Sequence, residues 1–187
     1  MSIIAKKQSN FIPPPEGVWP AVAVDVVDLG NVTDMWGTKH KIRIVWEISE
    51  KMADGKPYIA AKTYTLSLHE RASLAKDLKN MRGRAFTKEE LEGFDVEILA
   101  EKNVPCQLVI THVEKDDVTY GNITAITKAN PYSKLLPSGQ YVRAKDRPEN
   151  QIASNRQMMD SSGFQEDVKQ LNNPEYGEVE QEDDVPF

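Results

Sequence analysis

Five β-rich runs, with one helical segment inserted after the third, constrain most strongly what this chain can fold into. The runs extend over 18–29, 39–49, 58–68, 106–114 and 118–128, and glycine-containing or polar turns separate them. In the first run, Val22, Val24 and Val26 fall on one face if the strand alternates regularly. β-branched residues in such alternation are typical of strands with a buried face, so we expect an all-β domain of five strands.

The second run shows the alternation most clearly and divides into two unlike faces. One face carries His40, Ile42, Ile44, Trp46 and Ile48. The other face begins with three cations at alternate positions and ends in Val45 and Glu47. The pattern predicts that Trp46 lies in the core and that the opposite face is exposed and mostly basic.

The helical segment has start and stop signals. Ser67 followed by Glu70 matches a capping box, and Gly83 is typical of a helix end. Between them, apolar residues recur at helical spacing at Leu74, Leu78 and Met81. These signals predict a helix over about 68–81.

A second capping box, Thr87 with Glu90, predicts a short turn of helix that ends at Gly93. The order of elements is then β-β-β-α-β-β. This is the order of the OB-fold, a five-stranded Greek-key β-barrel with one inserted helix whose face and loops hold single strands or sugars. A generic five-stranded α+β domain shares the order and is the alternative.

The net charge of −6, from 23 Lys and Arg against 29 Asp and Glu in 187 residues, is the average of two unlike parts. Residues 1–88 contain 14 Lys and Arg against 9 Asp and Glu, whereas residues 160–187 contain 1 against 9. A basic body with an acidic end is expected of a chain that has both an anion-binding face and an interaction tail. A neutral fold with a solubilising tail is the alternative.

The composition divides the chain into four parts. We expect a flexible N-terminal arm over 1–16, the folded domain over 17–129, a mostly disordered linker over 130–177 and an acidic tip over 178–187. For residues 130–142 the alternative is packing on the barrel. No apolar run approaches the ~18 residues of a membrane helix, and residues 1–11 lack the apolar region of a signal peptide, so we expect a cytoplasmic protein without membrane contact.

The last residues form the most specific motif: Glu182, Asp183, Asp184, Val185, Pro186 and Phe187. This end resembles the acidic C-terminal tip of bacterial single-stranded DNA-binding proteins. The resemblance implies that the tip binds replication, recombination or repair proteins. A partner with a basic rim and an apolar slot can pair with the terminal carboxylate and bury the ring of Phe187, which contributes about 1.5–3 kcal/mol. An incidental solubility tail is the alternative.

The domain carries a resemblance of its own, in the segments 24–30, 39–47, 64–70 and 82–87. Over about residues 15–128 the chain resembles a family of phage-encoded OB-fold single-stranded DNA-binding proteins. The resemblance implies that the protein binds single-stranded DNA during phage replication, recombination or repair, in the cytoplasm of the host cell.

Binding of single strands without sequence preference needs cations that follow the backbone and aromatic rings on which bases stack. The candidates are Trp36, Lys39, Lys41, Arg43, Lys62, Tyr64 and Tyr120. Each has a structural alternative: the lysines and Arg43 as a solvated outer face, Trp36 as a lid on the barrel end, and the tyrosines as core residues.

No enzyme, cofactor or metal site is expected. His40, His69 and His112 lie on different elements, and the chain has no glycine-rich phosphate loop or paired Cys and His spacing. The single Cys106 begins an apolar run, which predicts a buried, inert thiol. The alternatives in function are an OB-fold protein-interaction adaptor and an RNA-binding OB protein, and formation of homo-oligomers is left open.

Overall fold

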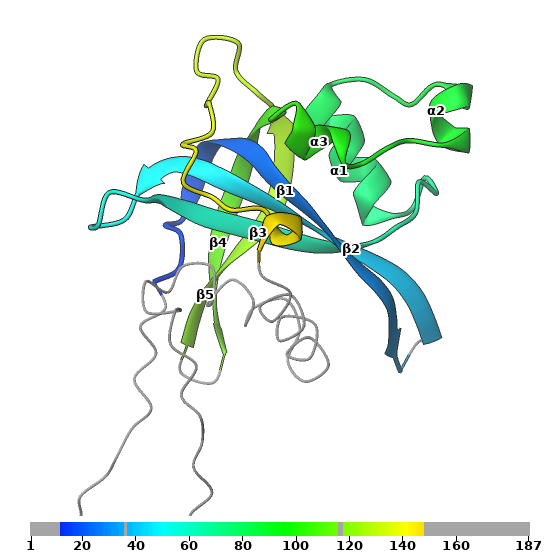
Figure 1. Ribbon diagram of the computed structural model, residues 1–187, viewed down its shortest axis with the longest axis horizontal. Coiled ribbons are helices and arrows are strands. Elements are labelled where there is room, and N and C mark those ends of the chain that lie inside the picture. Colours follow the sequence, from blue (N-terminus) through cyan, green and yellow to red (C-terminus); the bar gives the residue numbers. More distant parts are fainter. Residues whose placement is uncertain (1–11, 36, 116–117, 148–187) are drawn as a thin grey trace, which may run out of the picture.

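The computed structural model describes residues 12–35, 37–115 and 118–147, and its main element is one antiparallel five-stranded sheet (Figure 1). The strands lie side by side in the order β3-β2-β1-β4-β5. Their bounds are Gly17–Asp34 for β1, Gly37–Lys51 for β2, Pro57–Thr65 for β3, Pro105–Lys115 for β4 and Val118–Lys128 for β5. The five predicted strands are therefore confirmed. β1 and β2 extend beyond their predicted ends because they continue to pair as a long hairpin.

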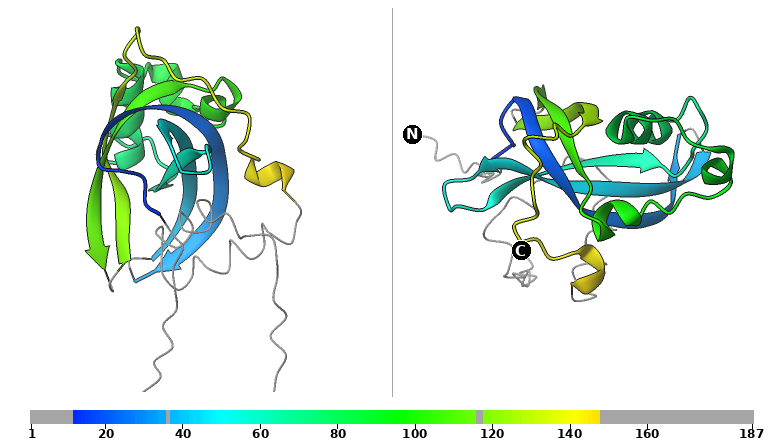
Figure 2. Two further views of the ribbon diagram at one scale, coloured as in Figure 1. Left: turned by 90° about the vertical axis from the view of Figure 1, so that its left-hand side faces the viewer. Right: turned by 90° about the horizontal axis from the view of Figure 1, so that it is seen from above.

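β1 organises the sheet because it pairs with two strands. Its first residues, Gly17 to Val22, pair with β4, while the stretch from Ala21 to Asp34 pairs with β2. The sheet curls so strongly that its edge strands, β3 and β5, come into contact (Figure 2). The inner face of the curled sheet encloses the main core.

A β-bulge in β1 changes which face its side chains occupy. The pairing with β2 shifts between Ala23 and Asp25, and an extra residue in a strand reverses the alternation that follows it. Val22 and Val24 therefore pack on the outer face, whereas Val26 packs against the main core. The prediction that the three valines share a face is wrong at Val26.

The main core joins the inner face of the sheet to α1 (Ser73–Arg82), and Trp46 is fully buried in it, as predicted. Leu74, Leu78 and Met81 of α1 are buried against the sheet, as their helical spacing predicted. α1 contacts both β3 and β5 and so covers the region where the two edge strands meet.

The predicted start of this helix is wrong. The capping box of Ser67 and Glu70 does not form, and α1 begins after Ala72, which makes no side-chain cap. The Ser67 hydroxyl instead accepts a hydrogen bond from the backbone N–H of His69 at 3.2 Å, a local turn that competes with helix formation. The predicted end is confirmed, because Gly83 caps α1 in the left-handed conformation with a φ of 68°.

Two shorter helices follow α1. The second predicted capping box is confirmed at the start of α2 (Lys88–Glu92), where Thr87 and Glu90 exchange hydrogen bonds. α3 (Ile98–Glu101), which the sequence did not predict, packs on β1. In the parts of the chain that the structure describes, no helix is both long and apolar enough to cross a membrane.

Residues 130–147, which we call the strap, return across the outer face of the sheet (Figures 1 and 2). The strap ends in the short 3-10 helix η1 (Ala144–Asp146). Its Leu135 and Tyr141 pack against a second apolar cluster, which consists of Val22, Val24, Val45, Ile59 and Ala61. The strap therefore belongs to the folded domain, as the alternative for residues 130–142 proposed, and the predicted linker boundary at residue 130 is too early.

The segment before β1 lies against the β4–β5 hairpin. The backbone N–H of His112 donates to Glu16 at 2.5 Å, and the imidazole Nε2 lies 2.9 Å from the carbonyl oxygen of Pro14. Gly121 pairs with His112, and a Cβ added to it would lie 2.9 Å from the Pro14 Cγ and 3.1 Å from the Pro14 oxygen. The end of the predicted flexible arm is therefore in contact with the sheet, and residues 1–11 lie outside the described residues.

Replacing Gly121 with alanine should destabilise the protein, because the new methyl group meets the backbone of Pro14. Overpacking of this kind costs about 1–3 kcal/mol in the free energy of unfolding, measured by urea denaturation. Gly93→Ala is the matched control, because Gly93 has an extended backbone and nothing within 4 Å of an added Cβ. Equal losses for both variants would contradict the close approach at Gly121.

Candidate nucleic-acid interface

Two of the predicted DNA-binding cations lie on the β1–β2 hairpin, which extends beyond the curled sheet (Figure 1). Lys39 pairs with Val32 and Lys41 with Gly30, so the two lysines lie on one face of β2 at alternate positions, about 7 Å apart. Lys39 is exposed, and Lys41 makes an ion pair of 3.2 Å with Asp34. The hairpin thus presents a short row of cations.

Other side chains of the hairpin are also exposed. His40 Nε2 lies 2.6 Å from Asp28 Oδ1 on the face opposite the lysines, and this contact joins the two strands. Met35, at the turn, is 88% exposed. Trp36, the predicted stacking residue of this turn, lies outside the described residues.

Arg43 continues the row of cations along β2 but is only 5% exposed. It pairs with Val27 on one side and Thr63 on the other, in the middle of the sheet. Two residues further along β2, on the same face, Val45 is covered by the strap. The prediction of a continuous exposed basic face therefore fails at Arg43, because both faces of β2 are buried there.

Lys62 and Tyr64 lie on the opposite face of the sheet from the lysines of the hairpin. They pair with the core residues Ile44 and Ile42, so their side chains belong to the inner face. Both contact Asp77 of α1: the Lys62 ammonium lies 2.7 Å from Oδ2, and the Tyr64 hydroxyl donates to the same oxygen at 2.9 Å.

This contact makes Tyr64 a structural residue. Burial, followed by the negative charge of Asp77, raises the pKa of Tyr64, so the hydroxyl stays protonated and keeps donating. The ring is 2% exposed and offers no face on which a base can stack. Lys62 and Tyr64 therefore attach α1 to β3, and the predicted site is divided between two faces of the sheet.

The remaining predicted residues do not join the hairpin lysines. Tyr120 lies on β5, where it pairs with Val113, and it is 8% exposed. β5 is the last strand in the sheet order, and β3, which carries Lys62 and Tyr64, is the first. The six residues of the predicted partner-binding tip, 182–187, lie outside the described residues. Of the candidates that the structure describes, Lys39 is exposed, and Lys41 lies beside it on the same face with its side chain 23% exposed.

Two arginines at the end of α1 and just after it, Arg82 and Arg84, form ion pairs within the domain. Arg82 forms an ion pair with Glu90 and stacks on Phe86 and Phe94, with its Cζ 4.7 and 5.0 Å from the ring centroids. Arg84 reaches the same carboxylate at 2.7 Å. These contacts, led by the hydrogen bond from Arg84, lower the pKa of Glu90 to about 2. The arginines thus hold the region around α2 together.

The outer face of the sheet contains two buried acids that hold the strap, and the sequence analysis missed both. Asp25 and Glu47 are each 1% exposed. Glu47 accepts hydrogen bonds from the backbone N–H and the hydroxyl of Ser138, at 2.7 and 2.8 Å. Because a buried carboxylate is costly without donors, these contacts fix the strap to β2.

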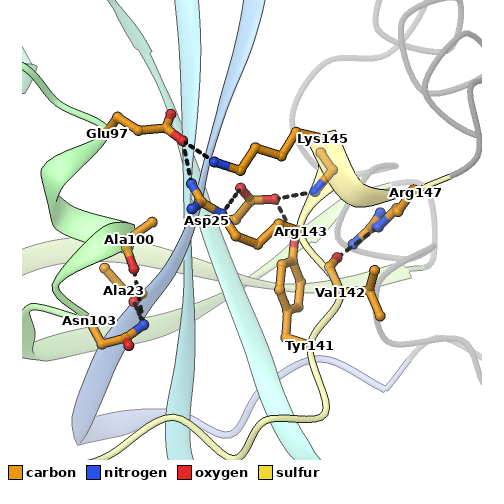
Figure 3. Close-up of polar contacts among 11 residues, drawn as sticks. Ala23, Asp25, Glu97, Ala100, Asn103, Tyr141, Val142, Arg143, Lys145 and Arg147 are labelled. Atoms are coloured by element: carbon orange, nitrogen blue, oxygen red, sulfur yellow. Dashed lines mark hydrogen bonds and ion pairs between the residues drawn. The ribbon is translucent and has the colours of Figure 1, made fainter.

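Asp25 receives three donors from the strap (Figure 3). The Ala144 N–H donates to it at 2.7 Å, the Tyr141 hydroxyl at 3.2 Å and the Arg143 Nε at 3.3 Å. Burial raises the pKa of Tyr141, and the charge of Asp25 raises it further. The strap is therefore fixed at both its backbone and its side chains.

Glu97, just before α3, adds a second acid to this cluster (Figure 3). The Arg143 Nη2 lies 2.6 Å and the Lys145 Nζ 3.1 Å from its Oε1. Burial acts to raise the pKa of Glu97, but the hydrogen bond from Lys145 and the charge of Arg143 lower it below its usual value. Arg143 thus bridges Asp25 and Glu97 and joins the strap to both β1 and α3.

The sequence contains a signal for this cluster. Asp25 and Glu47 interrupt strands that are otherwise rich in apolar residues, and a buried acid in such a strand needs a cation or donors from elsewhere. Arg143, Lys145 and Arg147 supply cations at alternate positions in a segment that the composition alone assigns to a linker.

Within residues 12–35, 37–115 and 118–147, no three His, Cys, Asp or Glu side chains are grouped so that they could hold a metal ion. No known protein-family model matches the chain, and no curated protein matches it either.

The ion pairs of Glu97 should make the stability of the strap contact depend on pH. A carboxylate whose pKa is lower in the folded state stabilises the fold above its unfolded pKa, and this contribution is lost as the pH falls below that value, 4.5 here. The difference in melting temperature between the wild type and Glu97→Gln should therefore be largest at about pH 6 and shrink toward pH 3.

Glu101→Gln is the control, because Glu101 is an exposed acid at the end of the same helix. Melting curves followed by circular dichroism measure the effect. A difference between wild type and Glu97→Gln that stays constant across this pH range would contradict the ionic contribution of Glu97.

Proposed function

We propose that this chain is an OB-fold protein that binds single-stranded DNA and recruits partner proteins through its acidic end. The fold assignment is supported by the strand order β3-β2-β1-β4-β5, by the contact between β3 and β5, and by helices inserted between β3 and β4. These features match a five-stranded Greek-key barrel.

The observation that carries the proposed function is the pair Lys39 and Lys41 on one face of the β1–β2 hairpin, of which Lys39 is exposed and Lys41 is partly exposed beside Asp34. In OB-folds, the loop after the first strand and the loop between the fourth and fifth strands flank the ligand. The β1–β2 and β4–β5 hairpins project toward the same side of the molecule (Figures 1 and 2). Cations spaced along one of these arms can follow a phosphate backbone.

The acidic end completes the proposal. Its resemblance to the tip of bacterial single-stranded DNA-binding proteins supports a role in recruiting replication, recombination or repair enzymes. The domain's resemblance to phage-encoded proteins supports action in the host cytoplasm. In this proposal the domain coats and protects the strand, and the tip brings the enzymes to it.

A protein-interaction adaptor is the second candidate, and the burial of Tyr64 and Tyr120 favours it. Because these rings are buried, the described residues among the candidates offer cations but no exposed aromatic ring on which a base can stack. Lysines such as Lys39 and Lys41 can also bind an acidic protein partner. Binding of oligo-dT at low salt distinguishes the two candidates. A matched RNA oligonucleotide tests the preference for DNA.

Titration of the full chain with fluorescent oligo-dT should show binding that weakens as salt increases, with much weaker binding of duplex DNA. The double variant Lys39→Ala/Lys41→Ala should lower the affinity and reduce the salt slope by about 1.4, since each phosphate contact on a single strand contributes about 0.7. Lys102→Ala, an exposed lysine at the end of α3, is the control. No binding of oligo-dT at low salt would contradict the proposed function.

Deleting residues 179–187 should leave the affinity for oligo-dT unchanged or make it tighter, because the deletion removes negative charge that repels or competes with DNA. Phe187→Ala, which keeps the acidic side chains, should bind oligo-dT like the wild type. The same titration measures both variants. A large loss of affinity on deletion would show that the tip belongs to the DNA-binding surface.

A further inference from the structure

The strap is basic, and part of its charge is not neutralised by the fold. Residues 130–147 contain four cations, Lys134, Arg143, Lys145 and Arg147, against the single acid Asp146. Arg143 is committed to Asp25 and Glu97, and Lys145 shares Glu97 while its side chain remains 55% exposed (Figure 3). The strap therefore adds positive charge to the outer face of the sheet.

Arg147 is held in place without an acid. Its Cζ lies 5.2 Å from the centroid of the Tyr141 ring, and its Nε donates to the Val142 carbonyl at 2.9 Å. Among the described residues, no carboxylate forms an ion pair with it. A guanidinium stacked on a ring and tied at one nitrogen loses little further freedom on binding a phosphate or a base.

Tyr141 connects this arginine to the row of cations on β2. Its hydroxyl donates to Asp25, which pairs with Val45, and Val45 lies two residues from Arg43 on the same face. Arg147 stacks on the Tyr141 ring, and the same ring packs against the outer cluster that contains Val45. From Arg43 the row continues outward along β2, about 7 Å a step.

We propose that the strap forms part of the single-stranded DNA-binding surface, with Arg147 and Lys145 continuing the cation row of Lys39 and Lys41. This inference rests on the proposed function. The alternative is that the strap covers the DNA-binding face and must leave it before DNA binds. The charge of the strap argues against it, because a segment that takes the place of DNA on a basic face should be acidic. The bonds of Asp25 and Glu47 to the strap also fix it in place.

The test is titration of the full chain with fluorescent oligo-dT at several salt concentrations. Arg147→Ala should weaken binding about three- to tenfold at low salt and reduce the salt slope by about 0.7, and Arg147→Lys should recover most of the slope. Lys145→Ala should act in the same direction. Lys134→Ala is the control. It removes one positive charge from the strap, as the other variants do, but Lys134 precedes Leu135, the first strap residue that packs on the outer apolar cluster.

Wild-type protein that binds oligo-dT while Arg147→Ala and Lys145→Ala bind equally well overturns this inference alone. Wild-type protein that does not bind contradicts the proposed function as well.

Discussion

The β-bulge between Ala23 and Asp25 is the constraint on which the rest of the domain depends. At this point the Ala23 N–H donates at 3.1 Å to the carbonyl of Val104, the residue just before β4, while the Asn103 side chain donates to the Ala23 carbonyl at 3.3 Å. The pairing of β1 with β4 ends just before, at Val22, and the pairing with β2 continues. The bulge is thus the place where β1 passes from two partners to one, and the chain after α3 supplies the hydrogen bonds that it needs.

The same bulge decides what covers the outer face. With regular alternation Asp25 would point into the core, where its charge would have no partner, whereas the extra residue turns it outward and brings Val26 inward. The outward carboxylate is still buried and accepts three hydrogen bonds from the strap. Removing one partner of a buried ion pair costs about 3–5 kcal/mol. The strap therefore stabilises the sheet by donating to Asp25, and the sheet in turn holds the strap in place.

The sequence predicted those parts of the structure that depend on local pattern. The five strands, the burial of Trp46, the end of α1 at Gly83 and the cap at Thr87 all follow from residues close together in the chain. The errors at the proposed binding site have long-range causes. Arg43 was assigned to an exposed face because the alternation of one strand cannot show that a segment about 100 residues later covers that face. Likewise, nothing near Lys62 and Tyr64 indicates that Asp77 of a packed helix binds both.

These long-range contacts also change how the charge of the chain should be interpreted. The excess of cations in residues 1–88 suggested a broad basic face, but Lys62 and Arg82 are partly buried and paired with Asp77 and Glu90. The strap, outside that range, supplies Lys145 and Arg147 instead. Affinity for a polyanion depends on cations that reach the surface, and in this proposal they come from two segments far apart in sequence, the β1–β2 hairpin and the strap. The middle of the outer face is filled by Tyr141 and Leu135, so a strand bound by these cations runs beside the strap rather than across the centre of the sheet.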